Sequence, residues 1–170
     1  MKKTMMMLLL ALVSLGAYAQ HEHGNMAGHD EGMQMAPEFK DKELGTAYGH
    51  YLEVKEALVA SDDGKATDHS AMLEKALAKV ENADAARETA AKMANATSLK
   101  GQRQNFDALS NEMAKLVKNG KLVKGELYLE YCPMANSNQG GYWLSNEKEI
   151  KNPYLGEKML TCGSVKETIK

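Results

Sequence analysis

Two short sulfur motifs near the end of the chain carry the residue types best suited to chemistry. Cys132-Pro133-Met134 comes first and Met159-Leu160-Thr161-Cys162-Gly163 follows, and together they hold both cysteines of the chain. Thiolates and thioethers prefer Cu(I) and similar soft ions to hard cations. Cys132, Met134, Met159 and Cys162 are therefore the candidate ligands of a copper site, with Cu(I) favoured and Ag(I) or Cu(II) as the other candidate ions.

The same two cysteines could instead form a disulfide, Cys132 with Cys162. Cysteines of exported proteins are commonly oxidised when their number is even. A bridge that closes a loop of about 30 residues would stabilise the fold by roughly 3 to 4 kcal/mol in the chain-entropy model. The sequence leaves both chemistries open at this one place.

The beginning of the chain has the pattern of a secretory signal peptide. Lys2 and Lys3 precede an apolar run, and Ala17-Tyr18-Ala19 places small residues where a signal peptidase reads them. We expect residues 1–19 to be removed by cleavage before Gln20, so that the protein is periplasmic, with full secretion as the minor alternative. No stretch reaches the roughly 18 to 20 apolar residues that a membrane span requires, so no span is expected after cleavage.

Residues 20–38 have neither a helical nor a strand period and are expected to form a flexible tail. Histidine favours Cu(II), Ni(II) or Zn(II) and methionine favours Cu(I), and short His-rich tracts often bind metal. The alternative is a solvated spacer of biased composition. The candidate ligands of this secondary metal site are His21, His23, Met26, His29, Met33 and Met35.

The charge and the motifs argue against several classes of function. The chain has 21 Lys and Arg against 23 Asp and Glu, and loss of Lys2 and Lys3 leaves 19 against 23, a formal net charge of −4. No basic patch is interleaved with aromatic residues, so nucleic-acid binding is not expected. The sequence also has no phosphate-cradling glycine loop, no nucleophile elbow and no zinc-protease His-Glu pair, so we expect no enzyme activity.

The ligands must be positioned by residues 39–170, which we expect to form one mainly α domain. Apolar residues at three- and four-residue spacings predict four helices between Phe39 and Asn119, joined by short connections into an up-and-down four-helix bundle. The first helix should end near Ser61 to Gly64, and Asn119-Gly120 should end the fourth in a left-handed turn. The expected caps of the later helices are Thr67 or Asp68, then Asp84, then Ser98.

After Gly120 the pattern predicts a loop-rich C-terminal cap that packs on the bundle. Residues 126–131 alternate as a short extended segment does, and Asn152-Pro153-Tyr154-Leu155-Gly156 is a strong turn signal. Long ordered loops inside a compact domain are usually functional. The metal or disulfide site is therefore expected where this cap meets the bundle.

Several other side chains have ordinary structural interpretations. Met72, Met93 and Met113 occur at helical core spacing and are expected to pack inward. His50 and His69 are expected to lie far apart, as surface or capping residues. Arg103 and Glu130 could each take part in an ordinary ion pair.

The spaced motifs also resemble a known family. They are residues 51–62, Arg103 with Phe106 and Leu109-Ser110, Tyr131-Cys132-Pro133-Met134, Trp143-Leu144-Ser145, residues 152–156 and residues 159–163. In this order they resemble an uncharacterised family of exported helical domains, found alone or fused to adaptor proteins of copper and silver efflux pumps, over residues 45–168. The segment Cys132 to Met134 is also similar to a small heavy-metal-binding module of such adaptors, in which His follows Met, whereas Ala135 stands there in this chain.

Two functions fit these observations. The first is a periplasmic copper- or silver-binding or handling protein that supports metal efflux or resistance, with the metal ion and an efflux adaptor as partners. The second is a disulfide-stabilised helical interaction module that docks on a partner and binds no metal. The His/Met tail and the family resemblance favour the first.

Overall fold

The computed structural model describes residues 37–170. The expected signal segment and the six candidate ligands of the tail lie outside the described residues, so cleavage before Gln20, the periplasmic location and the secondary metal site stay predictions. Within residues 37–170 the fold is mainly helical, with small antiparallel sheets toward the C-terminus. None of the described helices is long and apolar enough to cross a membrane.

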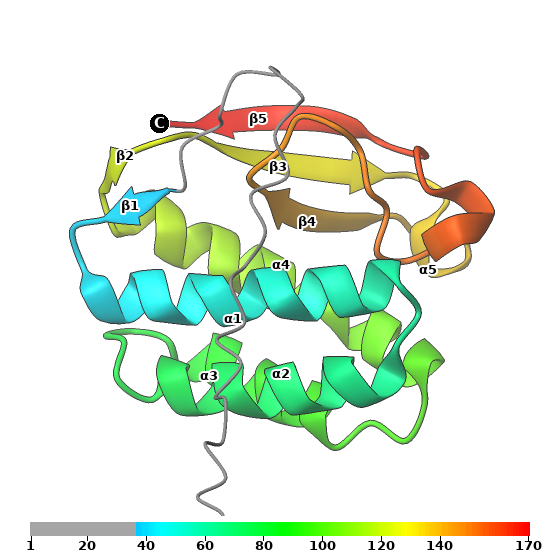
Figure 1. The fold of residues 1–170 in the computed structure, drawn as a ribbon, viewed down its shortest axis with the longest axis horizontal. Helices are drawn as coiled ribbons and strands as arrows, with labels where there is room; N and C mark the ends of the chain where they lie inside the picture. The colour runs from blue at the N-terminus through cyan, green and yellow to red at the C-terminus, as the bar shows by residue number, and fades with distance from the viewer. Residues whose placement is uncertain (1–36) are drawn as a thin grey trace, which may run out of the picture. The chain divides into compact units, whose positions relative to one another are not determined.

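Four helices account for the first part of the described chain: α1 (Lys42–Val59), α2 (Asp63–Leu77), α3 (Asp84–Ala94) and α4 (Leu99–Asn119). Each helix packs against the next one along the chain, and α4 also packs against a strand of the C-terminal sheet. Figure 1 shows this sheet on one side of α1 and α4, with α2 and α3 on the other side. The expected helices are present, but a four-helix bundle is not confirmed.

Side-chain caps begin three of these helices. Asp41 accepts hydrogen bonds from the backbone N–H groups of Glu43 and Leu44, and Ser98 caps α4 as expected. The expected cap of α2 was wrong, because Asp62 and not Thr67 or Asp68 accepts from the N–H of Lys65. A single left-handed residue, Ser61, lets the chain reverse at once, so α2 begins earlier than predicted. In α3, Asp84 is the first helical residue and Ala83 is the cap, without a side-chain bond.

The end of α4 also differs from the prediction. Gly120 has a φ of −81°, so it is not left-handed, and the positive φ falls on the next residue, Lys121, at 50°. Glycine leaves room here, because a Cβ on Gly120 would crowd the end of the Leu44 side chain and the carbonyl oxygen of Leu116. The end of α4 thereby packs closely on the start of α1.

The C-terminal part is a sheet where a loop-rich cap was predicted. Its strands are β3 (Leu127–Cys132), β4 (Gly141–Ser145) and β5 (Ser164–Ile169), with β3 in the centre and both pairings antiparallel. The short segments α5 (Ala135–Asn138) and η1 (Gly156–Met159) lie in the connections. A separate two-stranded sheet joins β1 (Glu38–Phe39) to β2 (Leu122–Lys124). The predicted extended segment is thus the central strand of a sheet.

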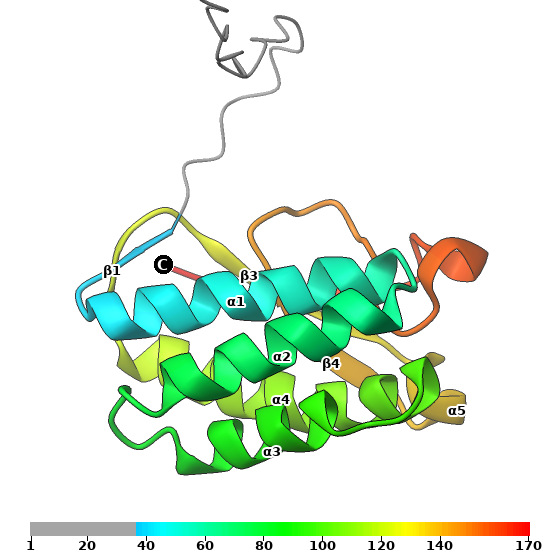
Figure 2. The same cartoon turned by 60° about the horizontal axis from the view of Figure 1, so that its bottom comes forward.

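The core between helices and sheet is largely aromatic. Tyr48, Tyr51 and Phe106 stack in a row, with ring centroids 6.0 Å and 5.4 Å apart. Two of the three methionines expected to pack inward do so, because Met93 and Met113 are fully buried. The third prediction was wrong: Met72 is 47% exposed on α2. Figure 2, turned to bring the helices forward, shows α1 and α2 running side by side.

Candidate functional site at Cys132 and Cys162

The fold brings the two cysteines into contact. Cys132 ends β3, and Cys162 lies in the turn before β5, whose residue Ser164 pairs with Tyr131. The two Sγ atoms are 2.9 Å apart, and both cysteines are free thiols. Cys132 is fully buried, whereas Cys162 is partly exposed. One thiol is therefore held in the core while the other can be reached from solvent.

Asn152 holds the turn that carries Cys162. Its buried side chain donates a hydrogen bond of 2.6 Å to the Cys162 carbonyl and accepts bonds from the backbone N–H groups of Tyr154 and Leu155. The residue after Cys162, Gly163, has a φ of +145°, and a Cβ there would lie 2.9 Å from the Trp143 ring. The predicted turn at residues 152–156 is thus the element that fixes the second cysteine.

Aromatic side chains belong to the same buried core as the Cys132 thiol. The rings of Trp143 and Tyr154 are 5.9 Å apart, and Cys132 belongs to the same buried core. Gly141, which pairs with Cys132 across the sheet, has no side chain, and a Cβ there would lie 2.7 Å from the Tyr154 ring. The absence of a side chain at Gly141 allows Tyr154 to cover the strand beside the thiol.

The distance between the two sulfur atoms is longer than in a disulfide and shorter than between two thiolates that bind one metal ion. A disulfide needs about 2.05 Å. Two thiolates that share one ion at metal–sulfur distances of about 2.3 Å lie roughly 3.7 to 4.6 Å apart. A separation of 2.9 Å is about 1 Å longer than a disulfide and about 1 to 2 Å shorter than the separation of two thiolates on one ion. Contact with Cys132 and burial raise the pKa of the Cys162 thiol, so both a metal ion and an oxidant must displace a firmly held proton.

Both predicted methionine ligands lie next to the cysteine pair in the chain. Met134 precedes the α5 turn, two residues after Cys132, and Met159 ends η1 and accepts a backbone hydrogen bond from Cys162. Their exposed fractions are 44% and 41%, which is high for long apolar side chains.

A cleft of about 760 Å³, lined by both polar and apolar side chains, lies between α4 and the α5 turn and extends to Tyr154. Asn136, Ser137 and Asn138 are consecutive residues with φ between 49° and 69°, a left-handed turn without glycine. Such conformations cost of order 1 to 3 kcal/mol each and tend to occur at functional sites. Arg103 and Asp107 of α4 line the same cleft.

The two residues expected to form ordinary ion pairs have other environments. Arg103 donates to the carbonyl oxygens of Pro153 and Leu58 and to the hydroxyl of Ser61, which ties α4 to the end of α1 and to the turn that holds Cys162. Glu130 is fully buried in β3, and its carboxylate has no hydrogen-bond partner among the described residues that meets normal geometry. Burial raises the pKa of Glu130 to about 8, although the Lys55 ammonium and the Trp143 indole act in the opposite direction.

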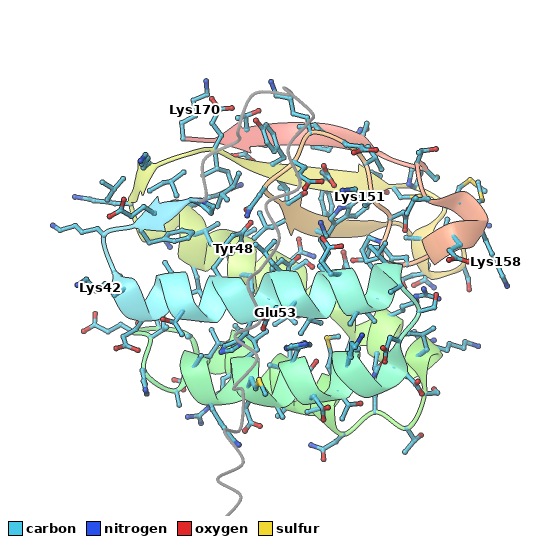
Figure 3. All side chains as sticks on the ribbon, in the orientation of Figure 1. Lys42, Tyr48, Glu53, Lys151, Lys158 and Lys170 are labelled. Carbon is cyan, nitrogen blue, oxygen red and sulfur yellow. The ribbon has the colours of Figure 1, made fainter. Side chains whose placement is uncertain are left out.

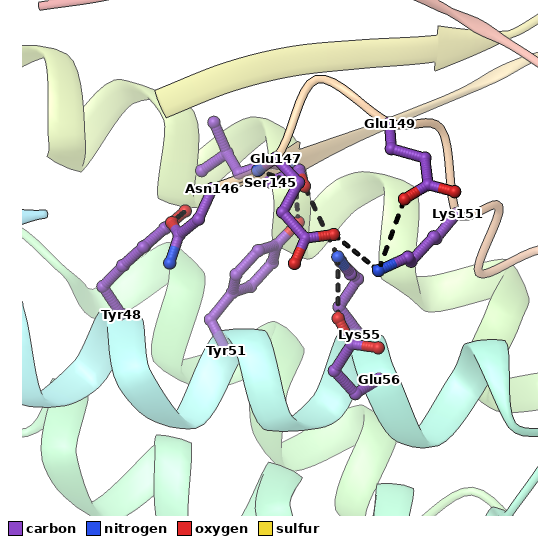
Figure 4. A network of polar contacts seen from close by, with 10 residues as sticks. Tyr48, Tyr51, Lys55, Glu56, Ser145, Asn146, Glu147, Glu149 and Lys151 are labelled. Carbon is purple, nitrogen blue, oxygen red and sulfur yellow. Dashed lines mark hydrogen bonds and ion pairs between the residues drawn. The ribbon is translucent and has the colours of Figure 1, made fainter. Parts of the chain in front are cut away.

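Lys55 is the buried cation on the helix side of this region. Its Nζ atom lies 2.8 Å from Glu56 and 3.5 Å from the hydroxyl of Ser145, at the end of β4. Figure 4 shows these contacts together with the neighbouring pair of Glu147 and Lys151. This network joins α1 to the connection after β4, so it supports the sheet that carries Cys132.

The prediction that His50 and His69 lie far apart was wrong. Both contact the same carboxylate, that of Glu53, at 2.9 Å and 3.0 Å. The sequence contained the signal, a histidine and a glutamate three residues apart on one helix, but the partner on α2 could not be aligned without the tertiary structure.

A family model matches residues 47–125 of the chain. The family is described as Protein of unknown function (DUF3347). Neither the curated proteins nor the solved structures give a match. The DUF3347 segment runs from α1 through α4 to β2, so it contains His50, Glu53 and His69 but ends before Cys132.

Proposed function

We propose that this protein binds and handles a soft metal ion, Cu(I) or Ag(I), at Cys132 and Cys162, in support of metal efflux or resistance outside the cytoplasm. The observation that carries the proposal is the convergence of the two thiols at 2.9 Å, from segments that are distant in the chain. The half-exposed Met134 and Met159 supply thioethers from the adjoining turns. An ion bound there would be anchored by a buried thiol and exchanged through an accessible one.

The charge balance of the site suits a monovalent ion. Two thiolates and one Cu(I) carry a net charge of −1. Burying this charge in the aromatic core would be costly, and the partial exposure of Cys162 to solvent lowers that cost. Methionine adds ligands without adding charge. The raised pKa of Cys162 means that metal binding releases protons, so affinity should rise with pH.

Anaerobic competition of reduced protein with a chromogenic Cu(I) chelator tests this site. Cys132→Ser and Cys162→Ser should each lower the stoichiometry by one ion, and Met134→Leu with Met159→Leu should weaken the affinity. Met72→Leu is the matched control, because Met72 is equally exposed but lies on α2. Unchanged stoichiometry in both cysteine variants would refute the proposed site.

The alternative function is a disulfide-stabilised module that docks on a partner, such as a metal-efflux adaptor, and binds no metal. It is supported by the same thiol contact and by the cleft beside the α5 turn. The intact mass of protein isolated without reductant separates the two states, because the bridge lowers the mass by two hydrogens. A protein that is isolated fully oxidised and does not bind Cu(I) even after reduction would favour this alternative.

A further inference from the structure

Two histidines and a glutamate from neighbouring helices converge on the side of α1 that faces α2. His50 and Glu53 are three residues apart on α1, so they lie on the same face, and His69 reaches them from the second turn of α2. Figure 3 shows Glu53 about midway along α1, the helix that runs beside α2. One ligand atom from each of these residues lies within 4.8 Å of the others. We call these three side chains the His-Glu-His cluster.

The Nδ1 atoms of both histidines converge on one carboxylate oxygen. The Nδ1 atom of His50 makes a hydrogen bond of 2.9 Å with Oε2 of Glu53. The Nδ1 atom of His69 is 3.0 Å from the same oxygen, but it is buried and makes no hydrogen bond among the described residues. Buried polar atoms without a partner are uncommon and call for an explanation such as an ion. A bound ion would give this nitrogen a partner.

The donor set selects a class of ion. Two imidazole nitrogens and one carboxylate oxygen suit borderline divalent ions such as Zn(II) and Cu(II), whereas Mg²⁺ and Ca²⁺ prefer oxygen and Cu(I) prefers sulfur. Ligand atoms around a tetrahedral ion with bonds of about 2.0 to 2.1 Å lie about 3.3 Å apart. The distances of 2.9 Å and 3.0 Å from Oε2 are close to that spacing, so small side-chain rotations would admit an ion.

Solvent can reach the cluster. The side chains of His50, His69 and Glu53 are 29%, 27% and 50% exposed, and Glu53 and His69 line a shallow depression of about 450 Å³. Three protein ligands leave a tetrahedral ion one open position, which is typical of exchangeable rather than purely structural sites. The ion would also tie α1 to α2 at their middle.

The cluster is separate from the cysteine pair. Tyr48, Tyr51 and Lys55 of α1 face the sheet that carries Cys132, because their polar atoms contact Asn146, Leu144 and Ser145. His50 and Glu53 are on the other side of the same helix. The cluster also lies within the DUF3347 segment, whereas both cysteines lie beyond it.

We propose that His50, Glu53 and His69 form a second metal site that binds a divalent first-row ion, of the Zn(II) or Cu(II) class, with an open coordination position. This site is independent of the proposed Cu(I) site. Its three ligands come from two helices whose relative position is fixed by the core, so the ion needs little rearrangement of the backbone.

Zn(II) titration followed by NMR of the imidazole nitrogens tests the proposal on the full chain, because each histidine gives its own signals. The ring nitrogens of His50 and His69 should shift together in one binding event. Glu53→Gln should lower the apparent affinity of that event by roughly 10- to 100-fold or more. Glu56→Gln is the matched control, since this carboxylate lies one turn along α1 and pairs with Lys55, and it should leave the affinity unchanged.

Three results would overturn the proposal. The ring signals of His50 and His69 could stay unchanged while those of the tail histidines shift, or the two rings could shift with different Zn(II) affinities. The third is a Glu53→Gln variant that binds Zn(II) with unchanged affinity. If Glu53→Gln fails to fold, the titration of the wild-type protein still tests the proposal, because it shows whether the rings of His50 and His69 shift together. Cys132→Ser should leave the His50 and His69 shifts intact, so loss of Cu(I) binding and loss of this site are distinguishable.

Discussion

The buried carboxyl of Glu130 should make stability depend on pH in the direction opposite to most acidic groups. Its side chain is fully buried in β3, and burial raises its pKa from an ordinary value of 4.5 to about 8. The folded protein therefore keeps Glu130 protonated at pH 7, whereas the unfolded chain has ionised it. The free energy of unfolding should fall as the pH rises from about 4.5 to about 8.

The magnitude follows from the two pKa values. Each tenfold difference in proton affinity, or one pKa unit, corresponds to about 1.36 kcal/mol. A rise in the pKa of Glu130 by about 3.5 therefore corresponds to roughly 5 kcal/mol in total. About 4 kcal/mol of this loss falls between pH 5 and pH 9, because both states are increasingly protonated below pH 5. Such a change is a large fraction of the stability of an ordinary domain.

Urea unfolding of reduced, metal-free protein at five pH values between 5 and 9 measures this loss. The difference in free energy of unfolding between wild type and Glu130→Gln should fall by about 4 kcal/mol across this range, since glutamine does not titrate. The control is Glu88→Gln, because its carboxylate is exposed on α3 and Lys92 lowers its pKa, which places its titration below this range. Parallel curves for wild type and Glu130→Gln from pH 5 to pH 9 would refute the reasoning.

Substitutions at three further positions test the packing of the fold, and two of these positions, Asn152 and Gly163, lie in contact with or next to Cys162. Gly163→Ala should destabilise the fold by about 2 to 4 kcal/mol in urea unfolding, because its φ is +145° and a Cβ would crowd the Trp143 ring; a loss below about 1 kcal/mol would contradict this. Asn152→Ala should lower the free energy of unfolding by about 2 to 4 kcal/mol, because it removes three hydrogen bonds of a buried side chain. Asn152→Asp should lose only the bond donated to Cys162 and keep the bonds accepted from Tyr154 and Leu155. Disulfide formation on air oxidation, followed by intact mass, should slow in both Asn152 variants, and an unchanged rate would show that the turn does not position the thiol. Leu109→Ala should cost about 2 to 5 kcal/mol, since this fully buried side chain of α4 leaves a cavity, and a midpoint of thermal unfolding equal to that of wild type would be inconsistent with that burial.

Local patterns in the sequence were sufficient for the helices. The spacing of apolar residues located α1 and α4, and the Ser98 cap was confirmed, because a cap depends only on atoms within one turn. The same reasoning failed at α2, where Asp62 and Thr67 are both good capping residues and only the position of α1 decides between them. The prediction that Met72 is buried also failed, since a helical period of apolar residues does not show how much of the helix surface its neighbours cover.

The sheet could be predicted only in part. The alternation in residues 126–131 indicated an extended segment, but β5 is exposed at five of its six residues and has no apolar face of its own. Such a strand is stabilised by pairing with β3, and pairing partners far apart in the sequence leave no local signal. The register of β3 with β5 is nevertheless what brings Cys162 to Cys132.

The sequence by itself determined the residue types of both candidate sites and the helical character of the chain, because these depend on composition and on spacing within one element. Only the tertiary structure decided that the two thiols touch and that His69 meets Glu53. Both contacts join separate elements, so they depend on strand register and on the alignment of two helices. A shift of one residue in β5 would part the two thiols, and a shift of one turn in α2 would part His69 from Glu53, although every local pattern would stay the same.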